Sequence, residues 1–262
     1  MEYQKNLEKI AIPIDDVIKK FQTDFLKVKK MGWVRSHRSH NTGIGKTFED
    51  VIGVKENSSQ SADYMDSLEL KSQRDFTGSM VTLFTKSPDH PLGANTFIRE
   101  TYGVSSDDDP RMKIIHTTIS GARDNHYKDN LSFKLEVDEK EKKIFLIVKK
   151  QNDGKIIDQS IYYRFDTLQP LVECKCRNIA YIEAETKTES GVEFFKYNSA
   201  ILLTNLTFKK FIDAVKNGLI LYDIRIGVYK TGKSLGKTHD HGSGFRIKKA
   251  DMDKVFTKTE IA

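Results

Sequence analysis

The chain has 262 residues, of which 38% are hydrophobic, enough for one large domain or for two lobes that share a core. Its 43 Lys and Arg residues outnumber 37 Asp and Glu residues, and the formal net charge of +6 favours a polyanionic partner without proving one. Residues 1–10 carry charges throughout and lack the apolar stretch of a signal peptide, and no run approaches a membrane span. Two cysteines, Cys174 and Cys176, are too few for a disulfide framework or a zinc module. We therefore expect a soluble, cytoplasmic protein with no membrane partner.

The first half of the chain predicts two helices and two strands. Apolar residues at helical spacing indicate an amphipathic helix over residues 14–30. Thr47, followed by Glu49, is typical of the N-cap of a second, short helix, with Glu49 beside its apolar side. Residues 68–72 and 80–86 are rich in strand-forming residues, and we predict that these two strands lie side by side.

The second half is predicted to be mainly β. Asp153-Gly154 is a hairpin signal, and Thr207 caps a helix that Gly218 ends. In the last long strand, apolar residues alternate with Asp223, Arg225 and Tyr229. The predicted strands cover residues 131–137, 144–149, 179–185, 193–203 and 219–229.

These elements predict an α/β fold with a mixed (α+β) sheet. We find no internal repeat and no low-complexity linker, so residues 1–262 are expected to form a single folding unit with two lobes. Residues 1–125 would form the N-terminal part, and residues 126–262 the β-rich part.

The run from Asp63 to Lys71 is the strongest candidate for catalytic chemistry. In an extended strand Glu69 and Lys71 share one face, while the neighbouring leucines are buried on the other. Asp63 or Asp66 would approach from the preceding turn, and a cluster of carboxylates is stable only with a cation. Such oxygen ligands suit Mg²⁺, which leaves coordination sites for a phosphate, and a lysine there can orient or deprotonate the attacking water.

The Glu-x-Lys spacing is weak evidence by itself, because it recurs at Glu141, Glu173 and Glu185. Glu141 lies in a charged bend, and Glu173 and Glu185 are expected on strands without a suitable upstream acid. Of the aspartates that precede Glu69, Asp63 and Asp66 both remain candidates, because neither spacing is decisive.

A basic, glycine-rich segment over residues 230–246 is the candidate for binding a polyanion. Lysines neutralise phosphates, and an arginine can bond guanine O6 and N7 in the major groove. Arg225 and Arg246 bracket this segment, although a solvated basic loop would have the same composition. Zinc binding by His239 and His241 is a weaker hypothesis, since no second Cys/His pair stands at zinc spacing.

The segment Gly43-Ile-Gly-Lys-Thr47 does not match a nucleotide-binding loop, because the glycines are too close together. The glycines are expected instead to let a loop approach DNA or to cap the helix that carries Glu49.

Five segments together resemble one known group of enzymes, the MvaI/BcnI family of type II restriction endonucleases, relatives of the mismatch-repair nicking enzyme MutH. They are Ser36-His-Arg38, Asn41 to Asp50, Glu69-Leu-Lys-Ser72, Leu83-Phe-Thr-Lys86 and Lys237 to Arg246. The resemblance implies a MutH-like PD-(D/E)-x-K core with two lobes around a DNA-binding cleft. It also implies a monomer that hydrolyses double-stranded DNA at a short pseudosymmetric site, of CC-N-GG type, by nicking the two strands in succession.

The resemblance also implies roles for particular residues. Asp63, Glu69 and the backbone carbonyl of Leu70 would bind Mg²⁺. Asp63 is preferred to Asp66, because Asp66 is so close to Glu69 that it is expected to fall within the same strand and point away. Lys71 would be the catalytic lysine, with Glu49 as a supporting carboxylate. Mn²⁺ is expected to substitute for Mg²⁺, and Ca²⁺ to support binding without cleavage.

For the DNA, the resemblance implies that Lys86 lies near the scissile phosphate. The residues expected to contact DNA are Arg225, Lys230, Lys233, Lys237, His239, His241 and Arg246. A companion DNA methyltransferase would act on the same site and need not bind the chain. Two alternatives remain open: a MutH-like nicking or repair endonuclease, and a DNA-binding module without catalysis.

Overall fold

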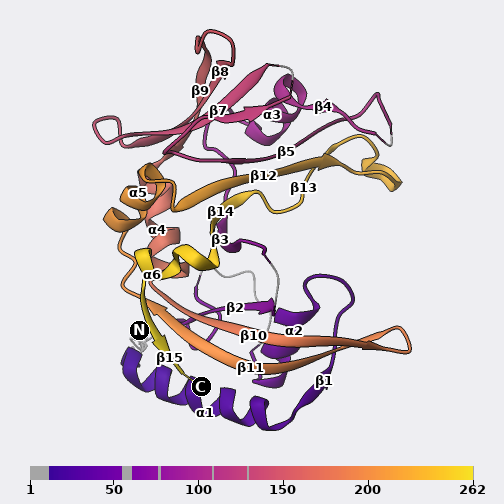
Figure 1. The fold of residues 1–262 in the computed structure, drawn as a ribbon, viewed down its shortest axis with the longest axis vertical. Helices are drawn as coiled ribbons and strands as arrows, with labels where there is room; N and C mark the ends of the chain where they lie inside the picture. Colours follow the sequence, from indigo (N-terminus) through magenta and orange to yellow (C-terminus); the bar gives the residue numbers. More distant parts are fainter. Residues whose placement is uncertain (1–11, 55–60, 76–77, 108, 129, 262) are drawn as a thin grey trace, which may run out of the picture. The chain divides into compact units, whose positions relative to one another are not determined.

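The computed structural model describes residues 12–54, 61–75, 78–107, 109–128 and 130–261. The predicted mixed α+β architecture is confirmed (Figure 1). Within those ranges, no helix combines the length and apolar character needed to cross a membrane. The N-terminal residues 1–10, considered above as a signal peptide, lie outside the described part.

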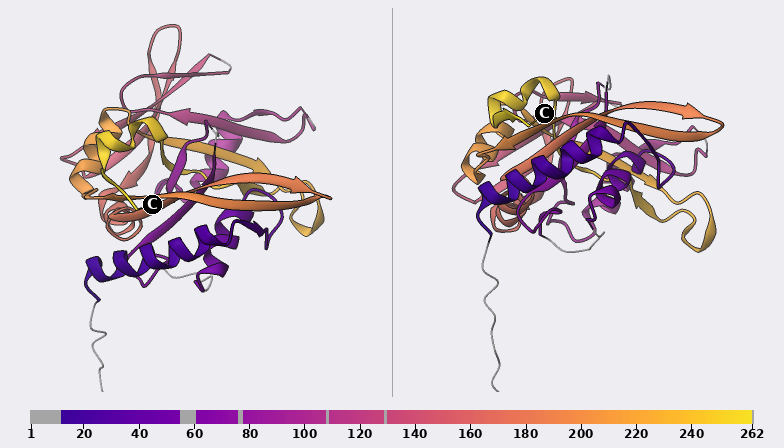
Figure 2. Two further views of the ribbon diagram at one scale, coloured as in Figure 1. Left: turned by 60° about the horizontal axis from the view of Figure 1, so that its bottom comes forward. Right: turned by 90° about the horizontal axis from the view of Figure 1, so that it is seen from below.

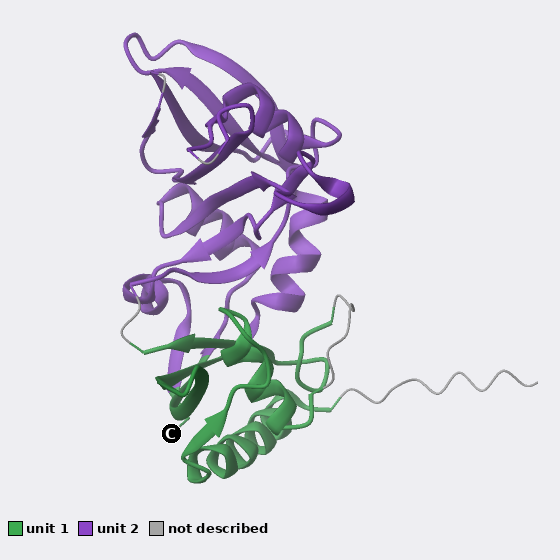
Figure 3. Cartoon of the chain, turned by 90° about the vertical axis from the view of Figure 1, so that its right-hand side faces the viewer, with its two compact units in different colours: residues 1–76, 180–202, 260–262 green, residues 77–179, 203–259 purple. Residues whose placement is uncertain are grey.

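The chain divides into two compact units, and each is assembled from separate stretches of sequence (Figure 3). Unit 1 comprises residues 1–76, 180–202 and 260–262. Unit 2 comprises residues 77–179 and 203–259. The chain therefore passes from unit 1 to unit 2 and back twice.

Unit 1 contains a five-stranded sheet with the order β1-β11-β10-β2, to which β15 adds by pairing with β11. A hairpin with a turn at Ser190-Gly191 joins its two longest strands, β10 and β11. The elements of this unit are α1 (Ile14–Lys30), β1 (Trp33–Arg35), α2 (Gly43–Val51), β2 (Glu69–Arg74), β10 (Asn178–Glu189), β11 (Val192–Thr204) and β15 (Thr257–Glu260). Because β2 ends the strand order, one of its edges is open to groups from the preceding loop.

The core of unit 1 lies between the two helices and one face of this sheet (Figures 1 and 2). The apolar side of α1 is fully covered, with Phe21 and Phe25 at 0% exposure. Phe48 of α2 packs against both rings at 6.2 Å between centroids. Burial of each such side chain stabilises the unit by about 1.5–3 kcal/mol. Leu70 of β2 belongs to the same core, so the core fixes which face of β2 points outward.

Unit 2 contains a six-stranded sheet and a four-stranded sheet. The six-stranded sheet has the order β3-β14-β12-β5-β4, with β13 also paired to β12, and the smaller one has the order β6-β7-β8-β9. The strands are β3 (Val81–Thr85), β4 (Val104–Ser105), β5 (Lys113–Ile119), β6 (Asn125–Tyr127), β7 (Leu131–Asp138), β8 (Lys143–Lys150), β9 (Ile156–Arg164), β12 (Ile220–Val228), β13 (Thr238–Asp240) and β14 (Gly244–Ile247). The helices are α3 (Ala94–Tyr102), α4 (Phe165–Lys175), α5 (Phe208–Lys216) and α6 (Met252–Val255), with short 3₁₀ turns η1 (Gly232–Ser234) and η2 (Lys249–Asp251).

The central strand β12 confirms the alternation predicted for it. Ile220, Ile224 and Ile226 are at most 1% exposed, whereas Arg225 between them is exposed. The predicted cap of α5 is also confirmed, since the Thr207 hydroxyl accepts a hydrogen bond from the Lys210 N–H at 3.3 Å.

Three local predictions are wrong. The strand at 80–86 does not lie beside the strand at 68–72: β3 pairs with β14 in unit 2, and β2 lies next to β10 in unit 1. Thr47 is not an N-cap, because α2 begins at Gly43 and Thr47 is buried within it, where its hydroxyl accepts from the His37 N–H at 2.9 Å. Glu173 lies on helix α4, not on a strand. Strand pairing decided the first case, and local residue preferences do not encode it.

The Asp24 carboxylate ties α1 to the turn before β2. Tyr64 donates a hydrogen bond to it at 2.7 Å, and Lys20 and Lys27 each donate one at 2.9 Å. Partial burial tends to raise the Asp24 pKa, but the hydrogen bonds from the two lysines and the tyrosine outweigh it and hold the pKa at about 2.

We predict that Asp24→Asn lowers the free energy of unfolding by about 1–2 kcal/mol at pH 7, after allowance for solvent screening of the two exposed lysines. A lowered carboxyl pKa stabilises the fold above the ordinary value near 3.8, and this is lost as the pH falls through 2. The difference between the wild type and the variant should therefore shrink between pH 4 and pH 2 in denaturant titrations. Asp16→Asn, on the exposed side of α1, is the control and should change stability little. Equal effects of the two substitutions would contradict this account.

Candidate active site and nucleic-acid interface

The outward face of β2 carries a tight ion pair. The Lys71 ammonium lies 2.6 Å from Glu69 Oε1, which bears out the predicted shared face. Glu69 is only 3% exposed, while the Lys71 side chain remains 24% exposed. A buried carboxylate therefore stands next to an ammonium that solvent still reaches.

Asp63 approaches β2 at the start of the strand. Its Oδ2 accepts a hydrogen bond from the Leu70 N–H at 3.1 Å. In a strand the N–H and C=O groups of one residue point to the same side, so the Leu70 carbonyl also lies on the side of Asp63. The carboxylate of Asp63, the Leu70 carbonyl and the Glu69 side chain are thus gathered at the first two residues of β2.

Asp66 occupies a different position from the one expected. It lies outside β2, in the turn that Tyr64 and Leu68 close, where its φ is +56° and its side chain is exposed. The expectation that Asp66 would fall within the strand is wrong. The structure thus joins Asp63 to the β2 backbone and leaves Asp66 at the tip of the turn.

Glu49 lies on α2, the helix that contacts β2. The start of α2 packs closely on the preceding loop, because a Cβ atom on Gly43 would lie 2.3 Å from the Arg38 carbonyl oxygen. This glycine therefore serves close packing of two segments of unit 1. Lys86 belongs to unit 2, and its ammonium is bound to Asp89 at 2.6 Å. Its predicted place near a phosphate stays a prediction.

The groups at β2 fit a hard divalent cation. They are oxygen donors, two carboxylates and one carbonyl, and Mg²⁺ needs no more than one or two carboxylates because it keeps several waters. In the described ranges, no three His, Cys, Asp or Glu side chains gather closely enough to hold one ion. That finding gives no support to a zinc site at His239 and His241.

In unit 2, strand register collects polar side chains on one face of the six-stranded sheet, which we call the reading face. Residues directly opposite each other in antiparallel strands point to the same side. Arg225 of β12 stands opposite His116 of β5. Two further pairs share that side: Gly227 with His239, and Leu221 with Arg246. The reading face is thus formed by alternate residues of β12 and their partners.

Asp223 is the organising carboxylate of the reading face. It is 6% exposed, and its Oδ2 lies 2.6 Å from Arg225 Nε and 3.1 Å from Arg246 Nε. Its other oxygen accepts from the Thr118 hydroxyl at 2.7 Å. One carboxylate thus pairs with two guanidinium groups: it accepts a hydrogen bond from Arg225 Nε, and its contact with Arg246 Nε is an ion pair.

Three histidines and a tyrosine continue the reading face. Tyr229 stacks on His239 at 4.1 Å between ring centroids, and His239 contacts His241 at the same distance. His116 meets His241 edge-on at 6.4 Å. Partial burial of the ring, followed by the proximity of His239 and His116, lowers the pKa of His241 below 6.5.

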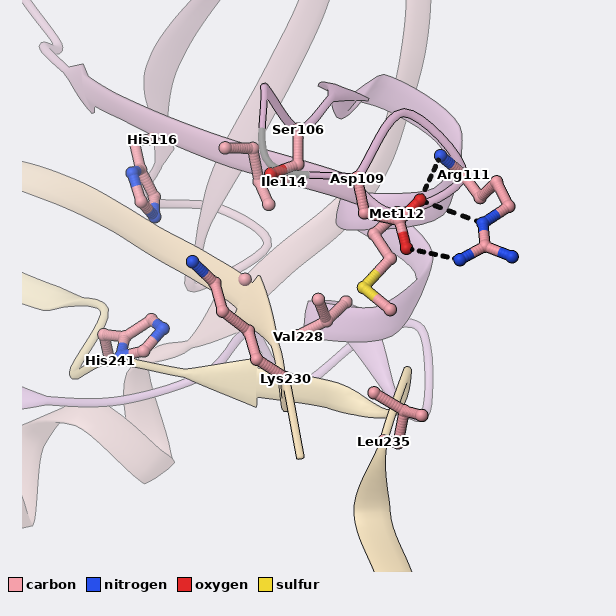
Figure 4. Close-up of a pocket in the computed structure, with 11 residues that line it drawn as sticks. Ser106, Asp109, Arg111, Met112, Ile114, His116, Val228, Lys230, Leu235 and His241 are labelled. Carbon is pink, nitrogen blue, oxygen red and sulfur yellow. Dashed lines mark hydrogen bonds and ion pairs between the residues drawn. The ribbon is translucent and has the colours of Figure 1, made fainter. Parts of the chain in front are cut away.

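Two hollows flank the pair His116 and His241. One, of about 470 Å³, is lined by Asp223 and Arg225. The other, of about 580 Å³, has apolar walls from Met112, Ile114 and Leu235. Figure 4 shows His116, His241 and Lys230 on one side of this second hollow and Arg111, paired with Asp109, on the other.

The predicted basic loop lies between β12 and β13. The Tyr229 N–H donates to the Lys237 carbonyl at 3.0 Å, and this bond closes the base of the loop. Lys230, Lys233 and Lys237 are all exposed. Together with Arg225 they place positive charge along the end of β12.

Comparison with known proteins shows which family the chain belongs to. The family model of the MvaI/BcnI restriction endonuclease family matches residues 22–256. The chain belongs to this family. It is therefore a restriction endonuclease, a site-specific deoxyribonuclease.

Two solved structures of the restriction endonuclease MvaI resemble the chain over nearly its whole length. The complex of MvaI with cognate DNA substrate has 38% sequence identity and a TM-score of 0.84, and the match covers 94% of this chain and 99% of that one. MvaI in the absence of DNA has 37% identity and a TM-score of 0.61, with 94% and 98% covered. No match was found among curated proteins. Restriction endonucleases of this family use divalent metal ions, and the oxygen donors at β2 are the groups that fit one.

Sequence reasoning missed two side chains of this endonuclease's reading face. His116 lies on β5, a strand that was not predicted, although Ile and Thr, which favour strands, make up most of it. Asp223 was placed on the polar face of β12 but was given no role. Its signal was present, because Asp223 and Arg225 repeat the two-residue spacing of Glu69 and Lys71.

We predict that His241 of this endonuclease titrates below 6.5 and is uncharged at neutral pH. His239→Asn should raise its pKa by removing a neighbouring positive charge, but only in part, since burial of the ring remains. Titration of the imidazole signals by NMR measures both values. His126→Asn on β6, outside this cluster, is the control and should leave the His241 curve unchanged. A His241 midpoint above 6.5 would refute this description of the reading face.

Proposed function

We propose that this chain is a Mg²⁺-dependent type II endonuclease that cuts double-stranded DNA at a short pseudosymmetric site of CC-N-GG type. The observation that carries the proposal is the convergence of Asp63, Glu69, Leu70 and Lys71 at the outer edge of β2. The similarity to an MvaI complex with cognate DNA supports duplex DNA as the substrate.

In the proposed mechanism, Asp63, Glu69 and the Leu70 carbonyl would hold the metal ion. The ion, when bound, supplies positive charge for the phosphate and lowers the pKa of a coordinated water. The Lys71 ammonium donates a hydrogen bond that orients the attacking water, while Glu69 keeps the ammonium in place through the bond at 2.6 Å. Glu49 supports the site from α2, and Lys86 is proposed to lie near the scissile phosphate. As the water attacks phosphorus it loses a proton to solvent, the bond from phosphorus to the 3′ oxygen breaks, and the departing 3′ oxygen takes a proton from solvent, which leaves 5′-phosphate and 3′-hydroxyl ends.

The reading face is proposed to recognise the bases. Arg225 and Arg246 are donors suited to guanine, and His239 and His241 lie beside them. Lys230, Lys233 and Lys237 would neutralise phosphates and add no sequence preference. We further propose that the chain acts as a monomer that nicks the two strands one after the other. A companion methyltransferase would protect the same site in the host.

We predict that Lys71→Ala abolishes cleavage of plasmid DNA in Mg²⁺ but keeps specific binding in Ca²⁺, because the ammonium acts on the water and not on the bases. Lys143→Ala is the matched control, since Lys143 forms a similar Glu-x-Lys ion pair with Glu141 at 2.7 Å. The control should cut normally and yield discrete double-strand fragments. Persistent cutting by the Lys71 variant would remove the assignment, and nicked circles alone from the wild type would favour a nicking enzyme.

A second prediction separates the two aspartates. Asp63→Asn should slow single-turnover cleavage at least about a hundredfold, equivalent to about 2.7 kcal/mol, because a metal ligand is lost. Asp66→Asn should change the rate by less than about threefold, since Asp66 lies at the tip of the turn. Titration of Mg²⁺ or Mn²⁺ by calorimetry should show weakened binding only for the first variant. The opposite ranking would assign the ligand to Asp66.

A further inference from the structure

Strands β13 and β14 pair with the same edge of β12. Between them lies a bulge opposite Arg225, formed by the turn at residues 240–243. The Arg225 N–H donates to the Ser243 hydroxyl at 2.8 Å, and the Arg225 carbonyl accepts from the His241 N–H at 2.8 Å. The same turn reaches the second arginine, because Arg246 Nη2 donates to the Gly242 carbonyl at 2.8 Å. Bulges re-aim side chains next to functional sites. Here the turn at 240–243 binds the backbone of one arginine and the side chain of the other.

Asp240 folds this turn. Its Oδ1 accepts from the N–H groups of Gly242 and Ser243, at 3.1 and 2.7 Å, and from the Ser243 hydroxyl at 2.7 Å. Ser243 is fully buried. The carboxylate therefore decides the orientation of the hydroxyl that receives the Arg225 N–H.

Helix α3 holds Asp240 from the other side of the sheet. Asp240 stands opposite Ile226 of β12, on the face away from Arg225 and His239. Asn95 Nδ2 donates to Asp240 Oδ2 at 2.9 Å and to the Ser87 hydroxyl at 2.8 Å. Both hydrogens of the Asn95 amide are thus used, which fixes the amide and, through it, the carboxylate.

We propose that Asn95 and Asp240 are positioning residues for DNA recognition. Through the turn at 240–243 they determine the orientation of the Arg225 and Arg246 side chains. Neither residue lies on the reading face, so neither touches a base. Base discrimination by a guanidinium depends on two well-aligned hydrogen bonds, and a small tilt of the arginines weakens cognate binding more than nonspecific binding. The inference rests on the proposed reading role of these arginines.

The test compares Kd for a duplex that contains the cleaved site with Kd for a scrambled duplex, in Ca²⁺. In Asp240→Asn, one amide oxygen can still accept from the turn, but the new amide nitrogen faces the Asn95 nitrogen and two donors oppose each other. We expect the ratio of the two Kd values to fall at least tenfold, about 1.4 kcal/mol, with nonspecific Kd nearly unchanged. Asn95→Ala should have a similar effect.

A double-mutant cycle shows whether the effects of Asn95 and Asp240 on DNA discrimination are coupled. In the Asn95→Ala background the opposing donor is gone, so Asp240→Asn should change the ratio by less than about twofold. Ser87→Ala is the matched control: it removes the other partner of Asn95, leaves the bond to Asp240, and should keep the ratio. Thermal melting of every variant shows whether it is folded, and so distinguishes a changed arginine orientation from a loss of folding.

The outcomes distinguish failure of the proposed base recognition by the arginines from failure of their positioning by Asn95 and Asp240. Arg246→Ala should abolish most of the discrimination, and if it does not, the proposed reading role itself fails. If Arg246→Ala abolishes discrimination while Asp240→Asn and Asn95→Ala both keep it, the positioning inference is refuted. Should Asp240→Asn fail to fold, Asn95→Ala decides alone, because it leaves the carboxylate and the turn bonds in place.

Discussion

The alternation of side chains along two strands is the constraint on which the rest of this endonuclease depends. On β2 the leucine at 70 enters the core and the glutamate and lysine at 69 and 71 point outward. On β12 the isoleucines are buried, and the residues between them form the reading face. Because the period of a strand is two, a shift of one residue in either strand would turn the charged side chains toward the apolar core and the apolar side chains away from it. The cores of the two units thus select the register in which the functional groups point outward.

Carboxylates act in both units as organisers of backbone or of cations. Asp63 fixes the start of β2 through the Leu70 N–H, Asp223 holds two arginines, and Asp240 folds a turn. A carboxylate removed from water is costly unless it is hydrogen-bonded; Asp223 is buried, Asp63 and Asp240 are half-buried, and each accepts at least one bond. The same bonds remove conformational freedom from the groups that are proposed to meet DNA. Rigid placement of this kind lowers the entropy lost on binding.

The position of the two arginines shows how distant chain segments converge on one face. Arg225 and Arg246 come from neighbouring strands, while His116 lies more than a hundred residues earlier and joins them only by pairing of β5 with β12. The same holds for Asn95, which reaches Asp240 from helix α3. The basic segment is contiguous in sequence, yet the side chains around it are contributed by three other elements.

The sequence by itself determined the amphipathic helix at 14–30, the alternation on β12, the shared face of Glu69 and Lys71, and the family, because each depends on local spacing or on short motifs read in order. Only the tertiary structure decided that β2 lies beside β10 and not β3, that Asp66 stands in a turn, and that Asp223 and His116 join the two arginines. Strand pairing, packing of glycine-containing segments and shared hydrogen-bond partners link residues far apart in the chain. Such contacts gain their energy from burial and register in the folded state, and local residue preferences carry no record of them.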